Sequence, residues 1–235
     1  MSKEDIKVKK IETKKKKKVN KEVVKTISFV LVIIAVISVI GYLCFLVIGN
    51  NKNNKPQETV KKNINEIEGY GITLDDQDSE LYKELFNELK KNLESKDINK
   101  KEYAKSVAEM YIVDLYSINN KLNKYDISTE LIWPTIADNY RTQVMDTLYL
   151  YVEDNSRKQR DQNLPEVKSI EVDTIKESKY VYNNGTDKDT SDDVTYDAYE
   201  IELTWTYRIK YGYDTTATVI VINDNDKMYV VEQKA

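Results

Sequence analysis

The stretch YEIELTWTYRIKY, residues 199–211, alternates strictly between apolar or aromatic residues at odd positions and polar residues at even positions. Successive side chains of a strand point to opposite faces, so this alternation predicts one long strand with a buried face and a solvated face. Further strands are predicted at 167–182, 215–223 and 228–233. Short turns rich in Asn, Asp and Gly separate them, which makes neighbouring strands antiparallel.

Helical periodicity precedes these strands. Residues 79–95, SELYKELFNELKKNLES, carry Leu at every fourth position, and Asp78 or Ser79 is the predicted N-cap. A second apolar stripe runs from Asn99 to Leu122 with polar residues on the other side, and a third helical region lies within 128–153. Helices followed by an antiparallel meander predict an α+β fold, with about three helices packed on a curved sheet of about four strands.

The N-terminal part of the chain has the pattern of a membrane anchor. Residues 1–25 hold eleven Lys and four acidic residues, a net charge of +7, whereas residues 26–49 carry no charge. A helix of that uncharged length spans roughly 36 Å at ~1.5 Å per residue, enough for a ~30 Å hydrocarbon core. The excess of basic residues before this segment predicts a cytoplasmic N-terminus. The topology signal is the run Lys14, Lys15, Lys16, Lys17 and Lys18.

The main alternative to a transmembrane helix is a lipoprotein anchored at Cys44. Leu43 stands where lipid attachment favours a small residue, and apolar residues 45–48 continue beyond the cysteine. The uncharged segment is also longer than the apolar region of a cleaved signal peptide. These features favour a single-pass protein in the plasma membrane.

The predicted organisation has four parts. Residues 1–25 are a basic cytoplasmic tail, 26–49 the transmembrane helix, 50–76 a polar stalk and 77–235 an extracytoplasmic domain. The total charge of −4 leaves −11 for the residues from 50 onward. Membrane lipid is the expected partner of 26–49, and no nucleic acid is expected because no aromatic residue is interleaved in the lysine run.

The composition argues against most catalytic sites. The chain has no His and one Cys, which excludes Ser-His-Asp and Cys-His catalysis and multi-Cys metal sites. Glu200 and Glu202 share a strand face but are expected to form an exposed charge ladder. Acidic residues in two loops raise a calcium site as an alternative to solvated turns, but they do not match the EF-hand spacing. They are Asp187, Asp189, Asp192, Asp193, Asp224 and Asp226. We therefore expect no enzyme, cofactor or metal site.

The element order carries a resemblance. The segments YAKSVAEMYIVDLYSIN and YEIELTWTYRIKYGYDTTATVIVIND suit an outer domain in which helices wrap a curved sheet. Together with one tail and one membrane helix, this architecture resembles the inner-membrane assembly subunit of type IV secretion and conjugation systems. That group is similar in fold to the cystatin-like and nuclear-transport-factor-2-like domains. The resemblance implies a protein–protein scaffold or, in some relatives, a domain with a small-molecule pocket.

Five residues are candidates for a partner surface or pocket. Tyr199, Trp205, Tyr207 and Tyr211 lie on one face of the predicted long strand, where they form either a recognition surface or simply the core. Asp114 lies on the second helix, either directed into a cavity with a raised pKa or, as we favour, at the solvated edge of the apolar stripe.

The expected function is a non-enzymatic, membrane-anchored scaffold of an envelope-spanning complex such as conjugation or secretion machinery. Its partners would be other envelope proteins and further copies of itself. The alternative is an extracytoplasmic ligand-binding or sensory domain with a cone-shaped aromatic pocket, which requires a cavity of roughly 300 Å³ or more.

Overall fold

The computed structural model describes residues 63–183 and 193–234, all of which lie in one compact unit, Pro56–Ala235. The predicted basic tail, lysine run and transmembrane segment lie outside the described residues. Within the described ranges, no helix has both the length and the apolar character needed to cross a bilayer. The location of the membrane anchor at 26–49 therefore stays a prediction from the sequence.

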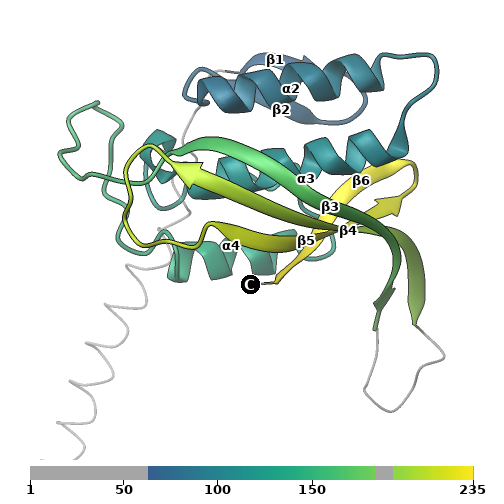
Figure 1. The fold of residues 1–235 in the computed structure, drawn as a ribbon. Coiled ribbons are helices and arrows are strands. Elements are labelled where there is room, and N and C mark those ends of the chain that lie inside the picture. The colour runs from purple at the N-terminus through teal and green to yellow at the C-terminus, as the bar shows by residue number, and fades with distance from the viewer. Residues whose placement is uncertain (1–62, 184–192, 235) are drawn as a thin grey trace, which may run out of the picture. The chain divides into compact units, whose positions relative to one another are not determined.

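Four antiparallel strands form the main sheet, as the sequence predicted (Figure 1). They are β3 Val167–Tyr182, β4 Val194–Tyr207, β5 Thr216–Asp224 and β6 Lys227–Lys234. The sheet order is β3-β4-β5-β6, so each strand pairs with its neighbour in the sequence. The prediction of an α+β fold with a four-stranded antiparallel meander is confirmed.

The alternation in β4 buries one face of the strand, but the strand ends earlier than predicted. Ile201, Leu203 and Trp205 are at most 1% exposed, whereas Ile209 is 58% exposed. After Tyr207 the chain leaves the sheet in a loop where Gly212 has a φ of +78°. Pairing with β5 stops at Thr204–Thr216, so the alternating residues beyond Tyr207 have no sheet to join on that side.

Three α-helices are described, and the first begins after Ser79, one of the two N-caps that the sequence predicted. The helix α2 spans Glu80–Leu93, and the side chain of Ser79 accepts a hydrogen bond from the Tyr82 N–H. The helix α3 spans Lys100–Tyr116, with Asn99 as its cap, and a short 3₁₀ turn follows at Ile118–Asn120. The third helix, α4, covers only Ala137–Asp146 of the predicted region.

The Ser79 cap provides a first test of the helix boundary. The Ser79→Ala variant is expected to lower the free energy of unfolding by about 1 kcal/mol, because the Tyr82 N–H loses its acceptor at a site that is 6% exposed. The Ser79→Thr variant keeps the hydroxyl and is expected to retain most of the stability. Urea denaturation followed by tryptophan fluorescence measures both, and equal losses would show that the hydroxyl is not the capping group.

The helix α3 lies at the centre of the domain rather than at its surface. Twelve of its seventeen residues are buried, including Glu109 and Ser106. It contacts α2 on one side and all four strands of the main sheet on the other. The prediction of a helix with one polar face was wrong beyond the first turn, because a layer covers each side of α3 (Figure 1).

A two-stranded hairpin precedes the helices, at a place where the sequence predicted a polar stalk. Strands β1 Asn63–Ile67 and β2 Ile72–Asp75 pair antiparallel, and Ile67, Ile72 and Leu74 are buried in the core. The turn uses Gly69 and Gly71 at φ values of +82° and +71°, which only glycine adopts without strain. The stalk prediction is therefore wrong for residues 63–75, which belong to the folded domain.

The segment before α4 attaches to the sheet edge. Ile132 forms a parallel bridge with Val230 of β6, and Trp133 packs against Ala198, Ile220 and Ile222 of the sheet. The Trp133 ring contacts Tyr182 and Tyr196 edge-on, and its indole N–H donates to Asp224 over 2.9 Å. This attachment delays the start of the helix to Ala137 and places α4 beside β6.

Candidate binding pocket

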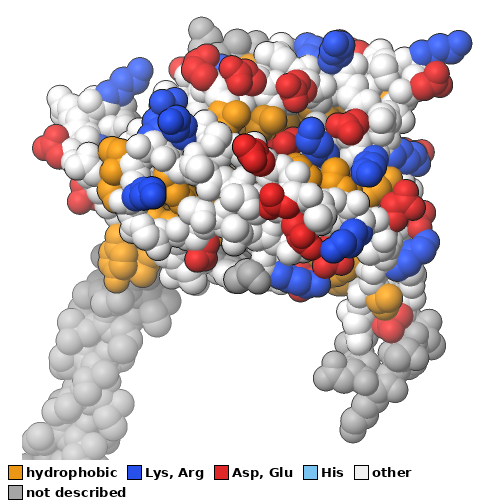
Figure 2. All heavy atoms as spheres, viewed as in Figure 1, with side chains coloured by type: hydrophobic (Ala, Val, Ile, Leu, Met, Phe, Trp, Pro, Cys, Tyr) orange, Lys and Arg blue, Asp and Glu red, His pale blue; other side chains and the backbone are white. Residues whose placement is uncertain are grey.

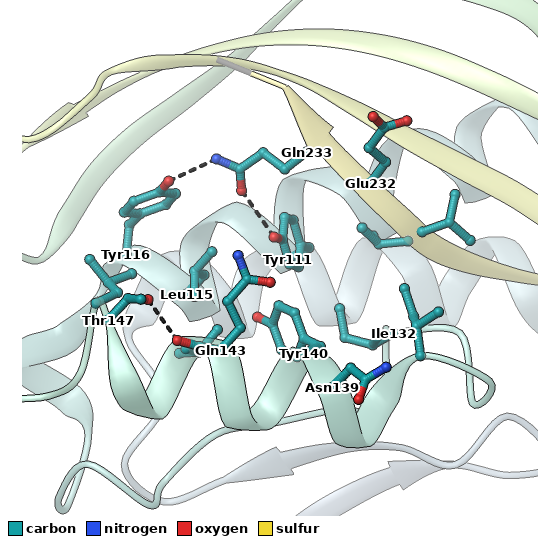
Figure 3. Close-up of a pocket in the computed structure, with 15 residues that line it drawn as sticks. Tyr111, Leu115, Tyr116, Ile132, Asn139, Tyr140, Gln143, Thr147, Glu232 and Gln233 are labelled. Carbon is teal, nitrogen blue, oxygen red and sulfur yellow. Dashed lines mark hydrogen bonds between the residues drawn. The ribbon is translucent and has the colours of Figure 1, made fainter.

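An open pocket of about 480 Å³ lies between α3, α4 and β6 (Figure 3). Its walls come from three parts of the chain that are far apart in the sequence. Apolar side chains form much of the surface, and hydroxyl and amide groups are placed among them. The fifteen lining residues include Leu115 and Tyr116 of α3, Tyr140 and Val144 of α4, and Val231 of β6.

The side chain of Gln233 connects the two tyrosines that α3 contributes to the pocket. The Tyr111 hydroxyl donates to the Gln233 Oε1 over 2.9 Å, and the Gln233 Nε2 donates to the Tyr116 hydroxyl over 2.8 Å (Figure 3). Tyr116 in turn stacks on Trp205, with 5.1 Å between ring centroids. One pocket wall is thereby fixed to the core of the sheet.

The opposite wall is the α4 helix. Tyr140 lies near Tyr111, with 6.1 Å between the ring centroids, and the side chains of Asn139 and Gln143 are exposed. The Thr147 hydroxyl donates to the Gln143 carbonyl over 2.6 Å at the end of the helix (Figure 3). Because α4 buries only Val144 completely, most of this wall remains open to solvent.

The pocket is electrically neutral apart from one carboxylate. Among the fifteen described residues that line the pocket, Glu232 is the only one with a carboxylate, ammonium or guanidinium group. Burial raises the pKa of the Tyr111 and Tyr140 hydroxyls above the usual value, so both stay protonated at neutral pH. The polar groups that remain are hydroxyls and amides, which can both donate and accept hydrogen bonds. Such a surface suits a neutral or cationic group with hydrogen-bonding capacity.

The four aromatic candidates from the sequence do not line this pocket. Trp205 is 1% exposed and Tyr207 is 8% exposed, so both side chains belong to the core and cannot form a recognition surface. For these two residues the core alternative stated above is therefore correct. Tyr199 is partly buried, and Tyr211 is 37% exposed in the loop after β4. The structure brings Trp205 only to the back of the pocket, through its contact with Tyr116.

Asp114 does not lie at a solvated helix edge, and the pocket that it lines has a volume of only about 10 Å³. Its Oδ1 is 2.5 Å from the Nζ of Lys121, and the two side chains are 13% and 3% exposed. Burial acts to lower the pKa of Lys121, but the carboxylates of Asp114 and Asp126 outweigh it and raise that pKa. The expected edge position is therefore wrong, and Asp114 is the partner of a buried cation.

The charged face of the sheet agrees with an exposed ladder. Glu202 accepts a hydrogen bond from Lys176 of the neighbouring strand over 3.0 Å, and both side chains are exposed. Figure 2 shows acidic and basic side chains interspersed over this face of the molecule. A second groove, of about 420 Å³, is lined by Glu177, by the paired Lys179 and Asp197, and by Lys100, which pairs with Asp226.

Two of the acidic loop residues, Asp224 and Asp226, have structural partners. Asp224 accepts from the Trp133 indole and Asp226 from Lys100, each over 2.9 Å. Across residues 63–183 and 193–234, no group of three or more side chains is arranged as metal ligands. Asp187, Asp189 and Asp192 lie outside the described residues, so the calcium alternative for that loop stays untested.

Sequence reasoning missed the pocket because no single segment encodes it. Tyr111 lies in the apolar stripe that predicts α3, and this position gives no sign of a pocket. Gln233 lies near the end of a predicted strand, where no motif marks it as a binding residue. The exposed amides Asn139 and Gln143 occur on the polar side of α4, where such residues are common. Their shared location follows from the bridge between Ile132 and Val230, which periodicity does not predict.

Comparison of the chain with models of known protein families, with characterised proteins and with solved structures found no match in any of the three.

Proposed function

We propose that this protein is a non-enzymatic, membrane-anchored scaffold or assembly subunit that holds a partner at the pocket between α3, α4 and β6. The observation that carries the proposal is the pocket itself, which is open, about 480 Å³ in volume and lined by aromatic and amide side chains. Aromatic side chains and neutral hydrogen-bonding groups are typical of surfaces that recognise other molecules.

The anchor and the location are inferred from the sequence. The uncharged segment 26–49 and the preceding lysines support a single-pass plasma-membrane protein with its folded domain outside the cytoplasm. A partner bound by such a domain would be another component of the cell envelope or a second copy of the chain. The arrangement of tail, anchor and α+β domain supports the finer proposal of conjugation or secretion machinery with a nuclear-transport-factor-2-like outer domain.

A ligand-binding or sensory domain is the second candidate function. The pocket volume of about 480 Å³ lies in the ~300–1,000 Å³ range of small-molecule sites, and this observation favours it. Native mass spectrometry of the full chain, purified in mild detergent, tests this candidate. A bound small molecule that is lost in a Gln143→Arg variant would support it over the scaffold.

Site-specific photo-crosslinking tests the scaffold directly. A benzophenone amino acid at Asn139, an exposed pocket residue on α4, is expected to give discrete protein adducts in membranes of the cells that carry the gene. The matched control is the same amino acid at Asn87, an exposed residue of α2 that does not line the pocket. Adducts of equal size and yield from both positions, or none from Asn139, would contradict the proposal.

A further inference from the structure

Among the residues that the structure describes, the outer edge of β6 pairs with main-chain groups at only one point. The Val230 N–H donates to the Leu131 carbonyl over 2.8 Å, and the Val230 carbonyl accepts from the Trp133 N–H over 3.0 Å. Within the described part of the chain, no main-chain group pairs with the outer edge of residues 231–234. Since unpaired strand edges are templates for further strands, β6 offers one beyond the bridge.

This free edge runs along the pocket. Glu232 and Gln233 belong both to the unpaired part of β6 and to the pocket lining. Across the pocket, Asn139 and Gln143 present side-chain amides, which match the donors and acceptors of a peptide main chain. A polypeptide segment lying along β6 would therefore meet hydrogen-bonding groups on both sides.

The chemistry of the pocket selects the composition of such a segment. The apolar part of the lining includes Leu115, Ile136 and Val144, which suits an apolar or aromatic side chain. Glu232 is the one charged group, its side chain is 44% exposed, and its nearest cation, Lys234, is 3.6 Å away. The chain from residue 50 onward has a net charge of −11. A basic residue next to the inserted side chain would complement both charges.

We infer that the pocket binds an extended segment of a partner polypeptide, which adds a strand to the outer edge of residues 231–234. The segment places an apolar or aromatic side chain between α3 and α4 and a Lys or Arg beside Glu232. Strand addition of this kind obtains affinity from main-chain hydrogen bonds and specificity from the pocket. The inference rests on the proposed scaffold function and names the chemistry of its partner.

Peptide selection on the full chain in lipid nanodiscs tests this inference. The probe is a displayed library of random nine-residue peptides, with empty nanodiscs as the counter-selection. The enriched peptides are expected to alternate apolar and polar residues and to contain a Lys or Arg next to an apolar position. Selection that enriches no peptide, or enriches acidic peptides, would overturn the inference.

Variants at exposed positions then locate the binding site. Synthetic copies of the enriched peptides are expected to lose at least ten-fold in affinity with Glu232→Lys and with Gln143→Arg, measured by fluorescence anisotropy. The matched controls Glu84→Lys and Asn87→Arg make the same charge changes on exposed positions of α2 and are expected to bind normally. Equal affinities across all four variants would place the peptide elsewhere and overturn the inference.

Two measurements separate strand addition from binding by side chains alone. The bound peptide is expected to slow hydrogen exchange of the amides in residues 231–234, and N-methylation of alternate peptide residues is expected to abolish binding. Binding that survives N-methylation in every register would overturn the inference. If Asn139 still crosslinks to an envelope protein in that case, the proposed scaffold function stands and only the strand-addition mode fails.

Discussion

Replacement of Lys121 by Met is expected to lower the free energy of unfolding by about 3–5 kcal/mol, the usual cost of removing one partner of a buried ion pair. Lys121 is 3% exposed, and its Nζ lies 2.5 Å from the Asp114 carboxylate. The Lys121→Met variant keeps the aliphatic volume but leaves that carboxylate buried without its cation. Urea denaturation of residues 56–235, followed by the fluorescence of the two tryptophans, measures the loss.

A double variant identifies the cause of the loss. Lys121→Met combined with Asp114→Asn removes both charges, so it is expected to be more stable than Lys121→Met alone. The matched control Lys83→Met breaks the exposed pair with Glu80 and is expected to cost at most about 1 kcal/mol. A double variant as unstable as Lys121→Met would show that packing rather than charge determines the effect.

The Lys121 ion pair also has a defined pH range. The pKa of Lys121 is raised in the folded state, so folding favours its protonated form. The contribution to stability is therefore fully present below the unfolded pKa of about 10.5 and is lost as the pH rises through the folded pKa. The domain is expected to lose this contribution only in strongly alkaline solution.

The Glu109→Gln variant is expected to stabilise the domain by about 3 kcal/mol at pH 8 and to have little effect near pH 4.5. Burial in the central helix α3 is the main reason that the pKa of Glu109 is raised to about 7, with Glu88 and Glu102 adding to the effect and Lys105 opposing it. Within the described residues, its Oε2 has no hydrogen-bond partner. Each pKa unit corresponds to about 1.4 kcal/mol.

The sign of the Glu109 effect follows from proton binding. Because the folded state binds the Glu109 proton more tightly than the unfolded state, stability falls as the pH rises from about 4.5 to about 7 and then levels off. The difference between the wild type and Glu109→Gln, measured by urea denaturation from pH 4.5 to 8, isolates this contribution. Glu84→Gln on the exposed surface of α2 is the control, and a pH-independent difference would contradict the assignment.

Local sequence patterns predicted the positions of the helices and strands much better than they predicted which parts of the chain pack around each element. The alternation of residues 199–211 located β4, the predicted cap Ser79 located the start of α2, and the apolar stripe from Asn99 located α3. Each of these signals depends on residues close together in the sequence. The position of α3 between two layers does not, and for this reason the polar face predicted for it was largely absent.

The errors share one physical origin, which is pairing between distant segments. The stalk prediction failed because residues 63–75 bury only a few apolar side chains, in a core shared with helices that come later in the chain. Asp114 was assigned to a solvated edge because Lys121 lies seven residues away and beyond the end of the helix. The pocket needs α3, α4 and β6 together, so no local pattern could have located it.

The bridge between Ile132 and Val230 has a consequence for the order of events on the ribosome. Residues 131–133 are synthesised more than ninety positions, and α4 more than eighty, before the strand that fixes them, Lys227–Lys234. In the nascent chain, α3 and α4 therefore lack their contacts with β6 until that strand has been made. The pocket cannot be complete before this strand has been made, and a stalled or shortened chain ending before Lys227 cannot contain it.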